Sequence, residues 1–424
     1  MSRFEVVAFS INDVVGSGVY LLPAAAALAL GGASPWAVLL AGLGVSLVVL
    51  CFAEAGSLFD RPGGAYVYTR AAFGEFVGFE VGWMTWLARL TSVAGLTAGF
   101  AQAVTAVWPG AAHGWGRAVT IIAVITGLTA VNLVGVKAGA RTSVVLTIGK
   151  IVPLVILIGA GSFSIAWDRI APAAVPSLRD LGEVALLLLF AYAGFENTAA
   201  PAGEFRNPRR DVPFALLVTI AIVTALYTSI QVVALGTVPD LAHASTPLAD
   251  SARIVLGPHG VWLLTIGAMV SILGTNNNTM LAGPRYLWAL AASGRLPAPL
   301  ARIHPRWRTP HVAILFQSAV ALPLALSGTF VELAALSAIA RLATYAGTAA
   351  AVPVLRNKLR ATPRTIRLPG GPTIPLAALV LCTLFFLSAE PRSWFAAAIA
   401  LAVGAGLYLS HRKGPDEGSG LPPP

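Results

Sequence analysis

The sequence consists largely of apolar runs long enough to cross a lipid bilayer. About twelve runs of roughly 17–30 residues are separated by short charged or Pro/Gly-rich stretches. We expect spans at residues 5–30, 36–59, 76–107, 117–137, 142–164, 181–204, 212–236, 258–292, 311–327, 330–354, 372–388 and 394–411. Only 11% of the residues are charged and the mean hydropathy is +0.78, whereas a soluble chain carries about a quarter charged residues. The sequence therefore predicts an all-α polytopic membrane protein.

The basic residues predict how the spans are oriented. Of the 28 Lys and Arg residues, about 20 fall in loops on the side of the N-terminus and about 5 on the other side. Because basic loops stay in the cytoplasm, we expect both termini there, in a bacterial-type plasma (inner) membrane. The net charge of +10 is scattered over these loops and does not form the basic stripe of a nucleic-acid-binding protein. Residues 412–424 are rich in Gly and Pro, and we expect a disordered cytoplasmic tail.

Polar residues and helix breakers interrupt the first span. The segment Asn12-Asp13-Val14-Val15-Gly16-Ser17-Gly18, followed by Pro23, lies inside an apolar run. Glycine and proline free backbone N–H and C=O groups that hydrocarbon cannot satisfy, so protein or a polar cavity must cover the break. The half-helix that begins after the break presents its N–H groups and its positive end, which suits a carboxylate. The alternative is a glycine notch that lets two helices pack closely.

A similar interruption occurs in the sixth span. The segment Phe190-Ala191-Tyr192-Ala193-Gly194-Phe195-Glu196-Asn197 is followed by Pro201 and Gly203. Two broken helices five spans apart are expected from an inverted pair of five-helix repeats, with the substrate where the breaks meet. We expect the repeats at 1–164 and 181–354 and two extra helices at 372–411. Two unrelated kinks are the alternative.

Five motifs in a fixed order resemble those of a known family. They are Gly16 to Pro23, Arg61 to Tyr68, Phe190 to Glu196, Glu204 to Pro213, and the end of span eight from Pro284 to Pro297. With them, the chain resembles the amino acid–polyamine–organocation (APC) transporter superfamily, in its bacterial amino acid permease branch. The resemblance implies a leucine-transporter-like fold with discontinuous helices 1 and 6, in which spans one, two, six and seven rock against a scaffold.

The resemblance also implies a substrate site at the two breaks. The α-carboxylate of an amino acid would bind the first break, and the α-ammonium would bind freed carbonyls of the sixth span. Arg89 lies on a stretch of span three that faces the substrate in related exchangers, where a fixed cation disfavours cationic substrates. Asn278 replaces a tryptophan of the arginine exchangers, which argues against arginine as substrate. The expected substrate-binding residues are Val15, Gly16, Ser17, Gly18, Phe190, Ala191, Ala193, Gly194, Arg89 and Asn278.

Lys150 lies in the middle of span five, where a charged side chain is costly. In proton-coupled members of the superfamily, a lysine at this place replaces a sodium ion. Its ammonium would then bond carbonyls near Gly16 and polar groups near Ser271 and Thr275. Lys150 either loads and releases a proton during transport or serves as a permanently charged structural pin. Both interpretations argue against sodium coupling.

Two buried carboxylates are the other candidates for coupling. Glu196 follows the second break, at a place implicated in proton sensitivity in related exchangers, or it is simply held by local backbone amides. Asp13 either meets a substrate amine or pairs with Lys150 or Arg89, and Arg89 itself has Asp13 or Glu196 as possible partners. Glu54 and Arg341 are expected near span ends, with structural roles.

These observations together predict a secondary active amino acid transporter that works by proton-coupled symport or by substrate exchange. No catalytic constellation or metal-ligand spacing is evident, so we expect no enzyme activity, cofactor or metal, and the partners expected are substrate, protons and lipid. A sensor or non-transporting homologue, a sodium-coupled transporter and a polyamine transporter are the alternatives. The sequence does not predict the oligomeric state.

Overall fold

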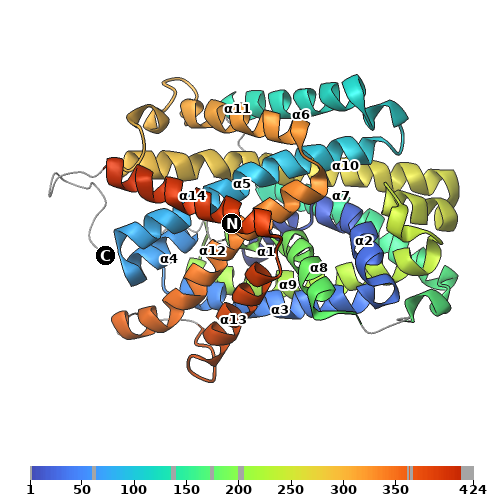
Figure 1. Ribbon diagram of the computed structural model, residues 1–424, viewed down its shortest axis with the longest axis horizontal. Coiled ribbons are helices and arrows are strands. Elements are labelled where there is room, and N and C mark those ends of the chain that lie inside the picture. Colours follow the sequence, from blue (N-terminus) through green and yellow to red (C-terminus); the bar gives the residue numbers. More distant parts are fainter. Residues whose placement is uncertain are drawn as a thin grey trace.

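The computed structural model describes residues 2–59, 64–134, 140–171, 176–198, 205–360, 362 and 366–411. These residues form helices joined by short turns, and no strand occurs among them (Figure 1). The α-helices are α1 (Arg3–Val14), α2 (Ser17–Leu30), α3 (Ser34–Gly56), α4 (Gly64–Phe73), α5 (Glu75–Val104), α6 (Gly114–Val134), α7 (Ala140–Gly161), α8 (Leu178–Tyr192), α9 (Pro208–Thr237), α10 (Pro247–Ala292), α11 (His311–Ser327), α12 (Phe330–Lys358), α13 (Thr373–Leu387) and α14 (Pro391–Ser410).

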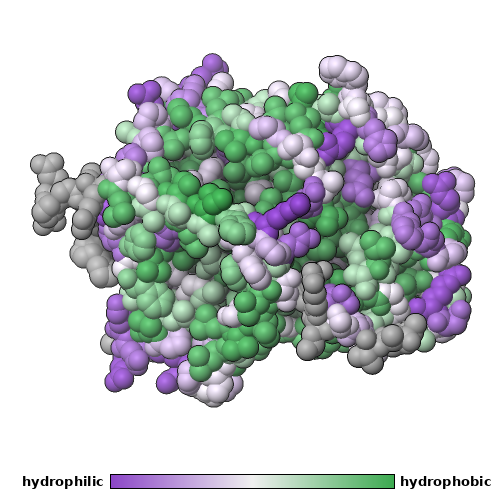
Figure 2. Space-filling view, viewed as in Figure 1, coloured by the Kyte–Doolittle hydropathy of each residue, from purple (hydrophilic) through white to green (hydrophobic). Residues whose placement is uncertain are grey.

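The helices confirm an all-α polytopic membrane protein. By length and composition, seven helical stretches among the described residues could cross a membrane, and α2 and α3 together count as one of them. Three shorter apolar helices occur at Val184–Asn197, His311–Ser327 and Thr373–Leu387. Hydrophobic side chains cover most of the middle of the face in Figure 2, and hydrophilic ones gather mainly toward the two ends of the long axis.

Two local features depart from the expected spans. The short helix α4 follows span two, where we expected no helix. Helix α10 begins eleven residues before the expected span at 258, but Gly257 has φ +70° and bends the chain there. A left-handed residue of this kind favours glycine, because it has no Cβ to clash with the backbone.

The first and sixth spans are both discontinuous. Helix α1 ends at Val14 and α2 begins at Ser17, with Gly16 between them. Helix α8 ends at Tyr192 and a single 3₁₀ turn follows at Phe195–Asn197. Pro201, Gly203 and Glu204 lie outside the described residues, as do Arg61 to Gly63 and the tail at 412–424.

The two breaks contact each other through their backbones. A Cβ added to Gly194 would lie 2.5 Å from the carbonyl oxygen of Asp13, and one added to Gly18 would lie 2.7 Å from Cα of Ala191. Gly194 also has φ +121°. The glycines therefore allow the helices to pack closely and also lie where the helices are interrupted. The two interpretations of this segment, a broken helix and a glycine notch, are both correct.

Helix α5 packs against both α10 and α12 in the interior, and α3 packs against α9 (Figure 1). Helices α6 and α11 lie side by side at one edge. Because α5 belongs to the first expected repeat and α10 and α12 to the second, the two halves of the chain interlock. The inverted-repeat relation of 1–164 to 181–354 stays a prediction.

Candidate functional site at the two helix breaks

A small polar cavity lies where the two breaks meet. Its volume is about 20 Å³, which is room for about one water molecule. Most of the expected substrate-binding residues line it, together with side chains from α5, α10 and α12. The lining residues are Asp13, Val14, Gly16, Ser17, Gly18, Arg89, Ser92, Leu96, Phe190, Ala191, Ala193, Gly194, Asn197, Thr275, Thr279 and Arg341.

The beginning of α2 forms one wall of the cavity. The first N–H groups of a helix have no partner within the helix, so they point at a site for an anion. The hydroxyl of Ser17 is completely buried and has no hydrogen-bond partner among the described residues. Gly16 and Gly18 have no side chains of their own, and they pack closely against Thr275 and Ala191. This wall can therefore bind a carboxylate with backbone N–H groups and one hydroxyl.

The end of α8 forms the facing wall. The carbonyl oxygen of Phe190 accepts a bond from N–H of Ala193 at 3.2 Å, and that of Ala191 accepts one from the Tyr227 hydroxyl at 3.2 Å. A carbonyl oxygen has two lone pairs, so each of these can accept a second donor such as an ammonium. The ring of Phe190 packs edge-on against Phe330, with 5.8 Å between the ring centres.

Lys150, on α7, lies behind the first break and does not line the cavity. Its Nζ donates to the carbonyl oxygens of Asn12 at 2.7 Å and Val15 at 3.1 Å, and to Oγ1 of Thr275 at 2.9 Å. The hydroxyl of Ser271 donates to the same Val15 oxygen at 2.9 Å. The ammonium thus uses all three of its N–H groups on the end of α1 and on α10. Val15 likewise contacts Lys150 rather than the cavity.

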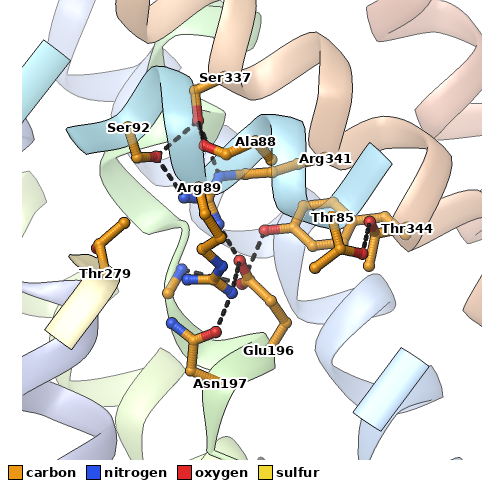
Figure 3. A network of polar contacts seen from close by, with 12 residues as sticks. Thr85, Ala88, Arg89, Ser92, Glu196, Asn197, Thr279, Ser337, Arg341 and Thr344 are labelled. Carbon is orange, nitrogen blue, oxygen red and sulfur yellow. Dashed lines mark hydrogen bonds and ion pairs between the residues drawn. The ribbon is translucent and has the colours of Figure 1, made fainter. Parts of the chain in front are cut away.

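Glu196 is the centre of a buried ionic network that joins α5, α12 and the 3₁₀ turn after α8 (Figure 3). Its Oε1 accepts bonds from Nη2 of Arg89 at 3.2 Å and from Nη1 of Arg341. Its Oε2 accepts bonds from the Tyr345 hydroxyl at 3.0 Å and from N–H of Gly194 at 2.9 Å. Glu196 therefore has both an ion pair and a local backbone amide, and it does not line the cavity.

The remaining expected residues have different partners. Asp13 accepts a hydrogen bond at 3.1 Å from Nδ2 of Asn278, a residue outside the cavity lining. Arg89 pairs with Glu196 and also donates to Oδ1 of Asn197. Arg89 also lines the cavity, so it forms an ion pair and contacts the candidate site at the same time.

The expectation that Arg341 lies near a span end is wrong. Arg341 lies well inside α12, is 5% exposed and lines the cavity. Its Nη2 donates to Oγ of Ser92 at 2.7 Å and its Nε to Oγ of Ser337 at 3.3 Å. The signal in the sequence was a charged residue eleven positions inside an apolar run. Its partners lie on distant segments, so the sequence did not show which way it points. Glu54 lies near the end of α3 and pairs with Arg356.

The sequence that forms these breaks, this cavity and these buried charges is similar to the sequences of known transporters. Residues 1–407 match the amino acid permease family. The chain belongs to the amino acid permease family. This permease is therefore a multi-pass membrane transporter for small molecules of the amino acid type, and not an enzyme.

Several relatives have named substrates. The permease is 32% identical to the serine/threonine exchanger SteT of Bacillus subtilis, over 87% of this chain and 86% of the relative. It is 26% identical to the methylthioribose transporter of the same organism, over 97% and 93%. It is 26% identical to the branched-chain amino acid permease BcaP, also from B. subtilis, over 92% and 87%.

Proposed function

We propose that the permease binds a zwitterionic amino acid between the beginning of α2 and the end of α8. It carries the amino acid by alternating access, as a proton-coupled symporter or an exchanger. The observation that carries this proposal is the hydroxyl of Ser17. It is completely buried, has no partner among the described residues and lies at a helix N-terminus in a cavity. A buried donor left unsatisfied costs about 1–3 kcal/mol, which a bound carboxylate would recover.

The position of Lys150 supports coupling to protons or to exchange rather than to sodium. A sodium ion at a broken helix would bind the freed carbonyl oxygens at the end of the half-helix. In this permease the ammonium of Lys150 already holds the carbonyl oxygens of Asn12 and Val15. A second cation beside it would meet like-charge repulsion in a dry environment.

Three further assignments belong to this proposal. The membrane is a bacterial-type plasma membrane with both termini in the cytoplasm, because the basic residues gather in the loops of one side. The coupling residues are Lys150, Glu196 and Asp13. The names of the relatives, which include an exchanger of serine and threonine, support a small amino acid as substrate.

Reconstitution into liposomes tests the proposed function. We expect unlabelled amino acid inside the liposomes to drive counterflow of labelled amino acid, and a pH gradient or internal amino acid to drive accumulation without sodium. Binding without counterflow would indicate a sensor. Uptake that requires sodium and ignores a pH gradient would overturn the coupling assignment.

A further inference from the structure

The buried charges around the cavity are not balanced. Among the residues that the structure describes, Arg89, Lys150 and Arg341 face two buried carboxylates, Asp13 and Glu196, and each of the five side chains is at most 5% exposed. Glu54 and Asp211 are buried too, but each pairs elsewhere, with Arg356 and Arg3. An excess cation at this depth is costly, so a substrate with a cationic side chain would raise the cost further.

The two arginines that line the cavity differ in how many of their donors are in use. Arg341 donates from all three nitrogens, to Ser337, Glu196 and Ser92. Arg89 donates only from Nη2, within the part of the chain that the structure describes. Its Nε is buried and has no partner there. The bonds from Nη2 to Glu196 and Asn197 therefore hold the Arg89 guanidinium in place, and its buried Nε–H stays unused among the described residues.

Ser17 and Arg89 both line the cavity, from different helices, and each has an unused donor among the described residues. Ser17 begins α2, whereas Arg89 projects from α5, where Ser92 and Leu96 also line the cavity. Figure 3 shows Arg89 and Ser92 on this helix. A ligand that satisfies both must carry two acceptor groups. The α-carboxylate of an amino acid supplies the first. A second acceptor has to come from the side chain.

We propose that Arg89 binds an oxygen atom of the substrate side chain, so that the permease selects small amino acids with a hydroxyl, carboxamide or carboxylate group. The class includes serine, threonine, asparagine and aspartate. The cavity of about 20 Å³ holds about one water molecule, so its walls must move apart to admit any amino acid, and they must move less for a small side chain. Arginine donates to each of these oxygens, and a charged donor left unpaired by an apolar analogue makes that analogue bind weakly. This inference rests on the proposed function, because it needs an α-carboxylate at Ser17.

Two pairs of amino acids provide the test, one pair with the same shape and one pair of opposite charge. L-Serine and L-2-aminobutyrate differ by one hydroxyl in place of a methyl group, and L-aspartate can be compared with L-lysine for charge. Each is used as competitor of labelled substrate binding to the purified wild-type permease. We expect serine to bind at least about tenfold more tightly than 2-aminobutyrate, and lysine to compete least.

An arginine variant tests the residue itself. Arg89→Lys keeps a cation beside Glu196 but removes the N–H groups of Nε and Nη1, so the ratio of serine to 2-aminobutyrate affinity should fall to about threefold or less. The ratio is measured within one protein, so it does not depend on how much of the variant folds. Arg117→Lys is the matched control. Arg117 donates to the carbonyl oxygens of Ala325, Leu326 and Gly328, away from the cavity, and the ratio should stay that of the wild type.

The outcomes separate this inference from the proposed function. Equal affinity for serine and 2-aminobutyrate, in a wild-type permease that binds both, would overturn the role of Arg89 and leave amino acid transport intact. An unchanged ratio in Arg89→Lys would do the same. Absence of binding by every amino acid in the panel would overturn both proposals. If Arg89→Lys does not fold, the comparison in the wild-type protein still decides the matter.

Discussion

Each buried charge of the permease is held by partners on another helix, and this determines the effect of removing it. The ammonium of Lys150 has three acceptors on the end of α1 and on α10. The carboxylate of Glu54, at the end of α3, accepts bonds at 2.6 Å from Nε and Nη2 of Arg356 on α12 and one at 3.0 Å from N–H of Leu368. Lys150 and its acceptors lie beside the candidate cavity, whereas Glu54 and its donors lie at the end of a span.

Lys150→Ala should abolish the pH dependence of uptake. The change removes the ammonium between the broken helix and α10, which is the group that we propose loads and releases the proton, while Asp13 and Glu196 remain. Uptake driven by a pH gradient in liposomes, compared with counterflow at constant pH, measures this effect. Lys358→Ala is the control, because Lys358 lies away from the breaks and, among the described residues, bonds backbone oxygens of Ala71 and Ala72 at the end of α4. Unchanged pH dependence in Lys150→Ala would remove Lys150 from the coupling role.

Arg356→Met should destabilise the permease by about 3–5 kcal/mol, because it removes the guanidinium that donates to both oxygens of the buried Glu54 carboxylate. The double variant Glu54→Gln with Arg356→Met should recover much of this loss, since neither charge then remains. Thermal unfolding midpoints of the purified variants measure both effects. A double variant less stable than Arg356→Met would contradict the assignment of a buried ion pair.

The broken helices depend on close backbone contact. Gly18 on α2 approaches Ala191 on α8, and Gly194 approaches the carbonyl group of Asp13. Neither neighbour can move aside as a flexible side chain would, because both contacts involve backbone atoms. The separation of the two walls of the cavity is thus set by glycines.

Gly18→Ala should weaken substrate binding by at least about tenfold and destabilise the fold by about 1–3 kcal/mol, the usual range for overpacking. The added Cβ would lie 2.7 Å from Cα of Ala191 and would push α2 away from α8. Substrate affinity and the amount of folded protein in the membrane are the measurements. Gly149→Ala on α7 is the matched control, because a Cβ there meets no atom within 4 Å. Wild-type affinity in Gly18→Ala would contradict the site.

The face of the molecule in Figure 2 has an apolar middle, and its hydrophilic side chains lie mainly toward the two ends. Its orientation follows from the basic loops. The segment with Trp167 belongs to the loop after span five and should lie outside, whereas Arg306, between spans eight and nine, should lie inside. Both side chains are exposed.

Cysteine labelling tests this orientation. In intact cells, a membrane-impermeant maleimide should label Trp167→Cys, and it should label Arg306→Cys only after permeabilisation. The native Cys51 and Cys382 are free and buried, so the wild-type protein serves as the unlabelled control. The reverse pattern would place both termini outside the cytoplasm.

The sequence by itself determined the fold class, the helical spans and the two breaks. Length and hydropathy report directly on whether a segment can cross a bilayer, and Gly16, Gly18 and Gly194 interrupt the helices through their own backbone chemistry. The sequence also identified Lys150 and Arg89 as charged residues within spans, where burial of a charge is costly unless it is paired or has a function.

Only the tertiary structure decided which of these charges meet. Glu196 lies 107 positions from Arg89 and 145 from Arg341, and nothing local in the sequence encodes such a contact. For the same reason Arg341 was misplaced at a span end, and the sequence left the partner of Asp13 open, whereas the structure shows a bond from Asn278. Membrane burial makes every charge expensive, but the direction in which each helix turns its charge, and hence its partner, is set by how the helices pack.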